Sequence, residues 1–261
     1  MKVYRLQESL KTKKFGKKII FLREINSTND FAKELASHGI EEGAVAVAEV
    51  QRAGRGRMGR QWSSPKGGLY FSIILRPKIK VSEAVKLVFV AGLAVAKVLE
   101  EIFRLKVEVK WPNDVLVSGK KVCGILVEMN SVGDHVNYLV VGIGVNANVN
   151  VEKQFPEHLR GTATSLEKEL GEKIQLEELF KRLLEKLEIF YDLFLESGLA
   201  PILEEWKKYA FFLNHHVDVI SEHEKFSGLA VDVNSDGALI VRLKNGEIKR
   251  VLVGDISVKI M

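Results

Sequence analysis

The sequence predicts an α+β fold, with a mixed sheet and helices followed by a small β-barrel. Helical and strand-like hydrophobic patterns alternate over most of the 261 residues. After Asn214 the chain changes to short alternating strands separated by hairpin turns. Hydrophobic residues make up 46% and charged residues 28%, which is the balance of a globular protein with a sizeable core. We therefore expect two domains, residues 1–213 and residues 214–261.

The first half of the larger domain is predicted to alternate strands with helices. Ser27, followed three residues later by Asp30, resembles a capping box, which marks the start of a helix. Apolar residues then recur every three or four positions from 82 to 103, which predicts a long, half-buried helix. In chain order we expect a strand at 18–23, a helix ending near Ser37, a strand at 44–50, a loop to Gly68, a strand at 69–75 and the helix at 82–103.

The remaining elements are predicted from turn residues and periodicity. Ser118-Gly119, Asp236-Gly237 and Asn245-Gly246 are typical of tight hairpin turns. Pro201 occupies the position that proline favours in the first turn of a helix. We expect strands at 107–111, 115–117, 121–128 and 136–146, a helix at 175–197, a shorter helix carrying Trp206, and a hairpin of strands at 238–244 and 247–253.

Composition argues against several classes of protein. No apolar run reaches the roughly 18 residues that a membrane helix requires, and the N-terminus lacks an apolar stretch of signal-peptide length. The single cysteine, Cys123, cannot form an intramolecular disulfide and fits a reducing compartment, so we expect a cytoplasmic protein. The net charge of +5 is too small to argue for nucleic acid by itself.

The run GRGRMGRQW at residues 54–62 is the most specific feature of the sequence. Its three arginines can offer guanidinium groups to phosphate, together with main-chain N–H groups. Its glycines make the loop costly to order, so the loop should fold over its ligand. An Arg/Gly segment of an RNA-binding protein is the alternative interpretation, but this run occurs once, lies between predicted strands and ends in Trp62.

Three other segments combine polar side chains with the ends of predicted elements. KWPND at 110–114 places Asn113 and Asp114 after a Trp-Pro turn, although taken alone an ordinary turn is the simpler explanation. GIGVN at 142–146 ends in Asn146, and its glycines indicate either backbone close to a ligand or a bulge. For the STN run at 27–29, spacing alone favours helix capping.

Taken together and in this order, these segments resemble the biotin–protein ligase family. The matched pattern is STN, QxxGRGRxGRxW, KWPND, KxxGILVE and GIGxN, and the resemblance covers roughly residues 20–261. It implies a catalytic domain related to class II aminoacyl-tRNA synthetases and an SH3-like C-terminal domain. It also implies an enzyme that activates biotin with ATP and Mg²⁺, and transfers biotin to a lysine of a biotin carboxyl carrier protein.

The resemblance assigns residues to the two sides of the site. The residues that it implies for biotin are Ser27, Thr28, Gln51, Gly54, Arg55, Gly56, Arg57 and Lys121. Those implied for ATP or the adenylate are Arg57, Arg60, Trp62, Asn113, Asp114 and Asn146. Within the same motifs, Asn29, Lys110 and Gly124 are further candidates for binding. No metal ligands are identified.

Lys121, Arg57 and Asp114 are the catalytic candidates. The resemblance places Lys121 against the biotin carboxylate, whereas Asp114 could either accept a proton from the attacking lysine or hold ATP or Mg²⁺. Alternation along a strand predicts that Lys121 shares a face with Cys123 and that Lys120 shares the other face with Gly124. We interpret Cys123 as a packing residue and not as a nucleophile.

Partners are expected by the same resemblance. Many family members carry an N-terminal helix-turn-helix, but only about 26 residues precede Ser27, so we expect no DNA binding and no repressor function. A homodimer formed through sheet edges is expected, because it is common in the family. A lipoate–protein ligase and an Arg/Gly nucleic-acid-binding protein are the alternatives. Whether pyrophosphate exchange into ATP depends on biotin, on lipoate or on neither separates the three.

Overall fold

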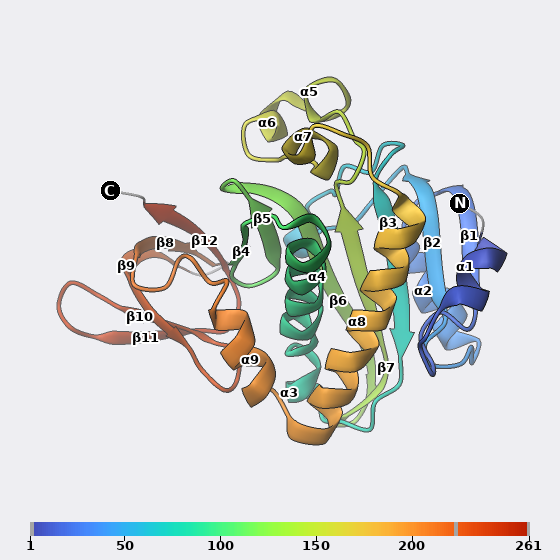
Figure 1. The fold of residues 1–261 in the computed structure, drawn as a ribbon. Helices are drawn as coiled ribbons and strands as arrows, with labels where there is room; N and C mark the ends of the chain where they lie inside the picture. Colours follow the sequence, from blue (N-terminus) through green and yellow to red (C-terminus); the bar gives the residue numbers. More distant parts are fainter. Residues whose placement is uncertain (1–2, 222–223, 260–261) are drawn as a thin grey trace.

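The computed structural model describes residues 3–221 and 224–259 and confirms the predicted α+β class (Figure 1). Seven strands form one mixed sheet in the order β1-β2-β3-β7-β6-β5-β4. The pair β1 and β2 is parallel, and the other neighbours run antiparallel. The strands are β1 (Ile19–Ile25), β2 (Val45–Gln51), β3 (Leu69–Leu75), β4 (Val107–Lys110), β5 (Asp114–Val117), β6 (Lys120–Val132) and β7 (His135–Val145).

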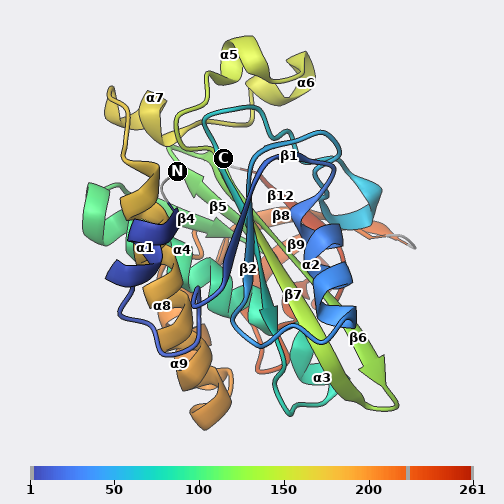
Figure 2. The ribbon, with the colours of Figure 1, turned by 90° about the vertical axis from the view of Figure 1, so that its right-hand side faces the viewer.

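Helices cover both faces of this sheet (Figures 1 and 2). The main helices of one face are α4 (Leu87–Phe103) and α8 (Leu176–Ser197), which pack on each other. On the other face α2 (Thr28–Ser37) packs against β2, β3 and β7 and leaves room beside it for the site described below. The shorter helices are α1 (Val3–Ser9), α3 (Val81–Ala84), α5 (Val151–Gln154), α6 (Glu157–Arg160), α7 (Leu166–Leu170) and α9 (Ala200–Lys207).

Local sequence signals account for most of these boundaries. Ser27 caps α2 as expected, because its side chain accepts a hydrogen bond from the N–H of Asp30. The predicted strand at 69–75 coincides with β3, in which every residue is buried, because the strand lies in the middle of the sheet with helices on both faces. Pro201 lies in the first turn of α9, as predicted.

The predicted helix at 82–103 is wrong in one respect, because the chain forms two helices there. The N–H groups of Val88 and Phe89 bond three residues back, to Val85 and Lys86, and these tighter turns separate α3 from α4. Val85, which fits the apolar periodicity, is 52% exposed. The stretch after Asn146, which carries no clear periodicity, contains the short helices α5, α6 and α7.

A second, antiparallel sheet of five strands closes the described chain, in the order β11-β10-β9-β8-β12. Its strands are β8 (His216–Ile220), β9 (Lys225–Val233), β10 (Leu239–Arg242), β11 (Ile248–Val251) and β12 (Asp255–Lys259). The predicted hairpin around Asn245-Gly246 is confirmed as β10 and β11. Trp111, which is 1% exposed, donates its indole N–H to the carbonyl of Gly237 at 3.0 Å and thereby joins this sheet to the larger one.

Candidate functional site

A hollow of about 870 Å³ opens beside the N-terminus of α2. It lies on the face of the large sheet against which α2 packs. Its floor is formed by β6 and β7, and its walls come from α2, the loop at 54–62, the segment at 155–163 and the start of β12. Such a volume accommodates a small organic ligand together with a nucleotide, within the usual range of ligand sites.

Glycines make the floor of the hollow. Gly124 and Gly144 lie opposite each other in β6 and β7, and the indole of Trp62 rests on both. A Cβ atom built on Gly144 would lie 2.3 Å from Trp62 Nε1, and one on Gly124 would lie 2.8 Å from the same ring. Gly142 lies two residues before Gly144 in β7, and the amide of Asn29 rests on it as Trp62 rests on Gly144. The glycines therefore bring aromatic and amide groups down onto the sheet backbone.

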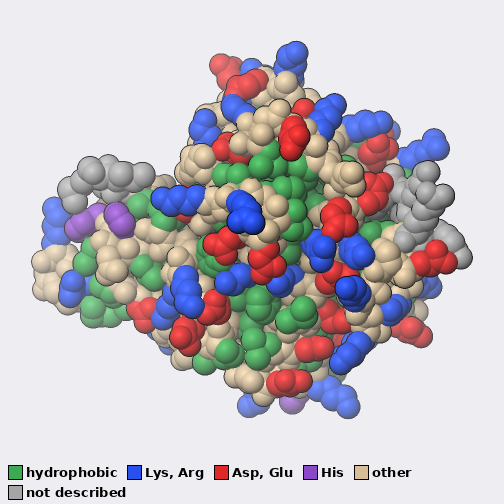
Figure 3. All heavy atoms as spheres, in the orientation of Figure 1, with side chains coloured by type: hydrophobic (Ala, Val, Ile, Leu, Met, Phe, Trp, Pro, Cys, Tyr) green, Lys and Arg blue, Asp and Glu red, His purple; other side chains and the backbone are tan. Residues whose placement is uncertain are grey.

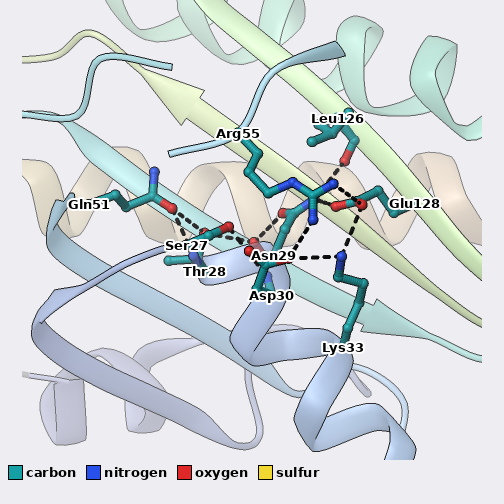
Figure 4. Close-up of polar contacts among 10 residues, drawn as sticks. Ser27, Thr28, Asn29, Asp30, Lys33, Gln51, Arg55, Leu126 and Glu128 are labelled. Atoms are coloured by element: carbon teal, nitrogen blue, oxygen red, sulfur yellow. Dashed lines mark hydrogen bonds and ion pairs between the residues drawn. The ribbon is translucent and has the colours of Figure 1, made fainter. Parts of the chain in front are cut away.

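Polar side chains at the start of α2 form a connected network (Figure 4). The side-chain oxygen of Gln51 accepts from both the N–H and the hydroxyl of Thr28, at 2.8 and 3.0 Å. Ser72, which is fully buried in β3, donates to Asn29 Oδ1 at 2.6 Å and lies 2.8 Å from Thr28 Oγ1. These contacts fix the direction in which each amide and hydroxyl presents its remaining donors and acceptors.

Arg55 and Lys33 converge on Glu128 of β6 in the same network (Figure 4). Arg55 also donates to Asp30 at 2.5 Å, and Glu128 accepts from the amide of Asn29 at 2.9 Å. Although partial burial raises it, hydrogen bonds from Lys33 and Arg55 hold the pKa of Asp30 below its usual value. The first arginine of the loop is therefore engaged by carboxylates of α2 and β6.

Arg57 and Arg60 bend toward the second sheet. Arg57 Nη1 lies 3.1 Å from both the carbonyl of Gly254 and the carboxylate of Asp255, and 3.4 Å from Asn113 Oδ1. Arg60 donates to the other carboxylate oxygen of Asp255. Burial, followed by the neighbouring charge of Arg60, lowers the pKa of Arg57 from its ordinary value. An anion in the hollow would relieve this concentration of positive charge.

Lys121 projects into the hollow between a carboxylate and an aromatic ring. Its Nζ lies 2.6 Å from Asp114 Oδ1 and 5.0 Å from the centroid of the Trp62 ring. Asp114 also lies 3.6 Å from Lys110 Nζ, so two ammonium groups share one carboxylate. The arrangement fixes the Lys121 ammonium group beside the glycine floor.

Side-chain alternation in β6 differs from the prediction. We expected Lys121 on the face of Cys123 and Lys120 on the face of Gly124. Instead the pairing of β5 with β6 shifts by one residue between Val115 and Leu116, and a Cβ atom on Gly124 would lie 3.3 Å from Lys121 Nζ. Because a β-bulge inserts one residue, it reverses the parity along the strand. Lys121 lines the hollow, and Lys120 is not among the lining residues.

Asn146 is buried at the end of β7, where the segment at 155–163 closes over the hollow. Its amide nitrogen donates to the carbonyl of Thr164 at 3.0 Å, whereas Oδ1 has no hydrogen-bond partner within the described residues. The covering segment is held by backbone hydrogen bonds from Lys121 N–H to Thr162 and from Thr164 N–H to Lys121. A buried acceptor of this kind usually has a partner, which a ligand can supply.

All the predicted site residues except Gly54 line the hollow. Gly54, the first residue of the loop, packs against the other end of the loop, where a Cβ atom would meet the carbonyl of Trp62 at 2.6 Å. Sequence reasoning missed several lining residues, among which are Lys106, Glu108, Gly142, Gly144, Phe155, Leu159, Ala163, Phe211, Asp255 and Ser257. Gly142 and Gly144 belong to the GIGVN motif at residues 142–146, so the sequence held a signal for them. Phe155 and Asp255 lie in segments without a distinctive pattern.

Two further observations bear on the chemistry. Cys123 is fully buried, and burial raises the pKa of its thiol, which agrees with a packing residue. Within residues 3–221 and 224–259, no group of three or more His, Cys, Asp or Glu side chains could hold a metal ion.

The glycine-floored hollow, with its arginines and Lys121, is a site for an anionic ligand. Comparisons with known proteins identify the class as that of the biotin and lipoate protein ligases. The model of the "Biotin/lipoate A/B protein ligase family" matches residues 21–146, and that of the "Biotin protein ligase C terminal domain" matches residues 212–259. The chain belongs to the biotin–protein ligase family.

Individual relatives give the same result. The chain is 36% identical over 95% of its length to the bifunctional ligase/repressor BirA of Bacillus subtilis, and it covers 76% of that protein. It is 33% identical over 85% of its length to the biotin–[acetyl-CoA-carboxylase] ligase of Paracoccus denitrificans, covering 92% of it. A structure of the Aquifex aeolicus biotin protein ligase with biotin and ATP is 32% identical, with a TM-score of 0.80, covering 93% of this chain and 99% of that one.

Proposed function

We propose that this protein activates biotin with ATP to biotinyl-AMP and transfers biotin to a lysine of a biotin carboxyl carrier protein. The observation that carries the proposal is the glycine-floored hollow, which brings Lys121 and the arginine loop together beside the N-terminus of α2. The proposal is supported by membership of the biotin–protein ligase family, because relatives of this chain are named as biotin–[acetyl-CoA-carboxylase] ligases.

The biotin side of the proposed site is the hydrogen-bonded start of α2. Ser27, Thr28, Asn29 and Gln51 would bind the polar head of biotin. Gly124 would let Trp62 and Lys121 lie close to the sheet beside it. This assignment is supported by the network that orients these side chains at the edge of the hollow. We propose that Arg55, Gly54 and Gly56 shape the loop that covers it, since Arg55 is engaged by Asp30 and Glu128.

The nucleotide side lies toward the second sheet in this proposal. Arg57, Arg60 and Lys110 would offset the charge of the phosphates, and Trp62, Asn113 and Asn146 would position the nucleotide. The unpartnered oxygen of Asn146 and the apolar side chains of Phe155 and Leu159 support a base-binding region under the covering segment. Mg²⁺ would arrive with ATP as part of the substrate.

The activation step needs charge neutralisation more than proton transfer. The carboxylate of biotin is ionised at neutral pH, so two anions must meet when it attacks the α-phosphate of ATP and displaces pyrophosphate. The Lys121 ammonium would bind the carboxylate, while Arg57 would stabilise charge that develops on the phosphate. The pair of contacts from Lys121 and Lys110 to Asp114 supports a positioning role for this carboxylate, namely to hold the Lys121 ammonium in place.

Biotin-dependent pyrophosphate exchange tests the function directly. We expect the folded protein to exchange labelled pyrophosphate into ATP only when biotin is present, because formation of biotinyl-AMP is reversible. Lipoate in place of biotin distinguishes the related acyltransferase activity. A folded protein that exchanges with lipoate alone, or with neither acid, would disprove the proposal.

We further propose a homodimer in which the outer edges of β6 pair. In the described residues β5 pairs with β6 only as far as Gly124, so the following part of β6 has β7 as its one neighbouring strand. Met129 and Val132 on this stretch are 40% and 72% exposed. Unpaired strand edges of this kind readily pair with another strand. Light scattering after gel filtration measures the mass, and a monomer at all concentrations would contradict the dimer.

The remaining expectations are also proposals. We propose that the chain does not bind an operator, which is supported by the interspersed positive and negative side chains on the face in Figure 3. Sequence-specific DNA binding at physiological salt would contradict this.

We propose a cytoplasmic location, supported by the single buried cysteine, and cell fractionation tests it. No helix in the described residues is long and apolar enough to cross a membrane.

We also propose that residues 1–213 and 214–261 are separate domains. The boundary is supported by the five-stranded sheet, which begins at β8, and by the separate family model for residues 212–259. Limited proteolysis that never cleaves between α9 and β8 would argue against a boundary there.

A further inference from the structure

We infer that Asp255, on the second sheet, is a positioning residue that holds the arginine loop of residues 54–62 closed over the hollow. The role of Asp255 depends on the proposed function only in the experiment that measures release of biotinyl-AMP. Its basis is one carboxylate that binds two arginines of the same loop, Arg57 through Oδ1 and Arg60 through Oδ2. Asp255 belongs to β12, whereas the loop belongs to the larger domain.

Burial distinguishes this contact from an ordinary surface ion pair. The side chains of Arg57 and Asp255 are 20% and 31% exposed, so their attraction is screened by solvent less than that of a fully exposed pair. The carbonyl of Gly254 adds a second acceptor for Arg57 at 3.1 Å. Since the loop contains three glycines, ordering it costs conformational entropy, which a contact of this kind offsets.

The geometry leaves Arg57 able to act on a ligand while Asp255 holds it. The hydrogen bonds of Arg57 to Asn113, Gly254 and Asp255 all use Nη1. Within residues 3–221 and 224–259, Nε and Nη2 of Arg57 make no hydrogen bond, so their donors can serve an anion in the hollow, which both Arg57 and Asp255 line. A carboxylate that competed with phosphate for the same donors would instead occupy the fork of the guanidinium group.

The second sheet is itself fixed relative to the larger domain, so Asp255 is a stable anchor. Trp111 is buried and donates to the carbonyl of Gly237 at 3.0 Å, in the turn between β9 and β10. A Cβ atom on Gly237 would lie 2.6 Å from the ring of Phe89, on α4. The KWPND segment thus contacts both domains, because Trp111 docks the second sheet and Asn113 contacts Arg57.

The first experiment needs no enzymatic activity. Trypsin cleaves after arginine, so the rate of cleavage within residues 54–62 reports how often the loop opens. We expect Asp255→Asn to raise this rate by roughly ten-fold or more, because it removes the carboxylate charge that binds both Arg57 and Arg60. Asp255→Glu should restore much of the protection. The matched control is Asp232→Asn, which removes another ion pair between the two domains, with Lys207 of α9 at 2.5 Å.

The second experiment measures release of biotinyl-AMP. Asp255→Asn should release it roughly ten-fold faster than the native protein, and Arg57→Gly should also speed release, because each removes one side of the same contact. In a variant that lacks both arginines, Arg57→Gly with Arg60→Ala, adding Asp255→Asn should speed release no further, because Asp255 acts through these two residues. Wild-type release in Asp255→Asn, a further increase when Asp255→Asn is added to that pair, or a lowered KM for ATP would overturn the inference.

The two experiments separate failure of the inference from failure of the proposed function. If the native protein makes no biotinyl-AMP, the proposed function fails and tryptic cleavage alone decides the role of Asp255. If Asp255→Asn melts at a temperature well below that of Asp232→Asn, Asp255→Ser, which also lacks the carboxylate, is compared in its place. Equal cleavage of the loop in the native protein and in a folded variant without the Asp255 carboxylate would overturn the inference.

Discussion

Replacement of Lys121 by alanine is expected to lower kcat/KM for adenylation about 1,000-fold, which corresponds to about 4 kcal/mol of transition-state stabilisation. The Lys121 ammonium lies beside the glycine floor, 2.6 Å from Asp114. If the biotin carboxylate binds there, Lys121 contacts it both before and during attack on the α-phosphate. Loss of the charge should therefore raise KM for biotin and lower kcat.

Lys120 provides the matched control for this prediction. It precedes Lys121 in β6, pairs with Val117 and is not among the residues that line the hollow. Lys120→Ala removes the same side chain and charge from the adjacent position, so it should remain within about two-fold of the native protein. Steady-state adenylation kinetics on both variants decide the matter. If the Lys120 variant were the inactive one, the assignment of Lys121 would be incorrect.

The fold was predictable where local chemistry determines it. The apolar run that became β3 is buried on both faces, and Ser27 forms its cap with Asp30 regardless of the rest of the chain. The site was predictable because its motifs are contiguous, so each of the five segments could be found in the sequence. Hydrophobic periodicity then placed these segments on strands or at helix ends.

The remaining features depend on contacts that no local pattern reveals. The bulge in β6 adds one residue to a strand pairing, and it reversed the side-chain parity that simple alternation predicts. Asp255 lies nearly two hundred residues from Arg57 in the sequence, and it approaches Arg57 only because the second sheet packs against the part of the chain that carries the loop. The segment carrying Phe155 lacks a long periodic pattern, and its position over the hollow depends on backbone bonds to Lys121.

The floor of the hollow leads to a second prediction of large effect, that Gly142→Ala raises KM for biotin roughly 100-fold. The added methyl group would lie 2.0 Å from Asn29 Oδ1, which is far inside van der Waals contact. Asn29 cannot easily turn away, because its amide is bound by Ser72 at 2.6 Å and by Glu128 at 2.9 Å. The N-terminus of α2 must therefore shift, and a misplacement of about 1 Å can cost roughly 100-fold. Because this end of the proposed site would bind biotin away from its reacting carboxylate, the loss should appear in KM.

Val141→Ala separates this effect from a general loss of stability. Val141 neighbours Gly142 in β7 but packs into the core and does not line the hollow. Its truncation should lower the free energy of unfolding by about 2 kcal/mol and leave KM for biotin close to the native value. The rate of pyrophosphate exchange, measured at increasing biotin concentrations, gives KM for both variants. Thermal melting gives their stability. A Gly142→Ala protein with the native KM for biotin would contradict the prediction. That result would mean that Asn29 moves aside without disturbing the biotin site.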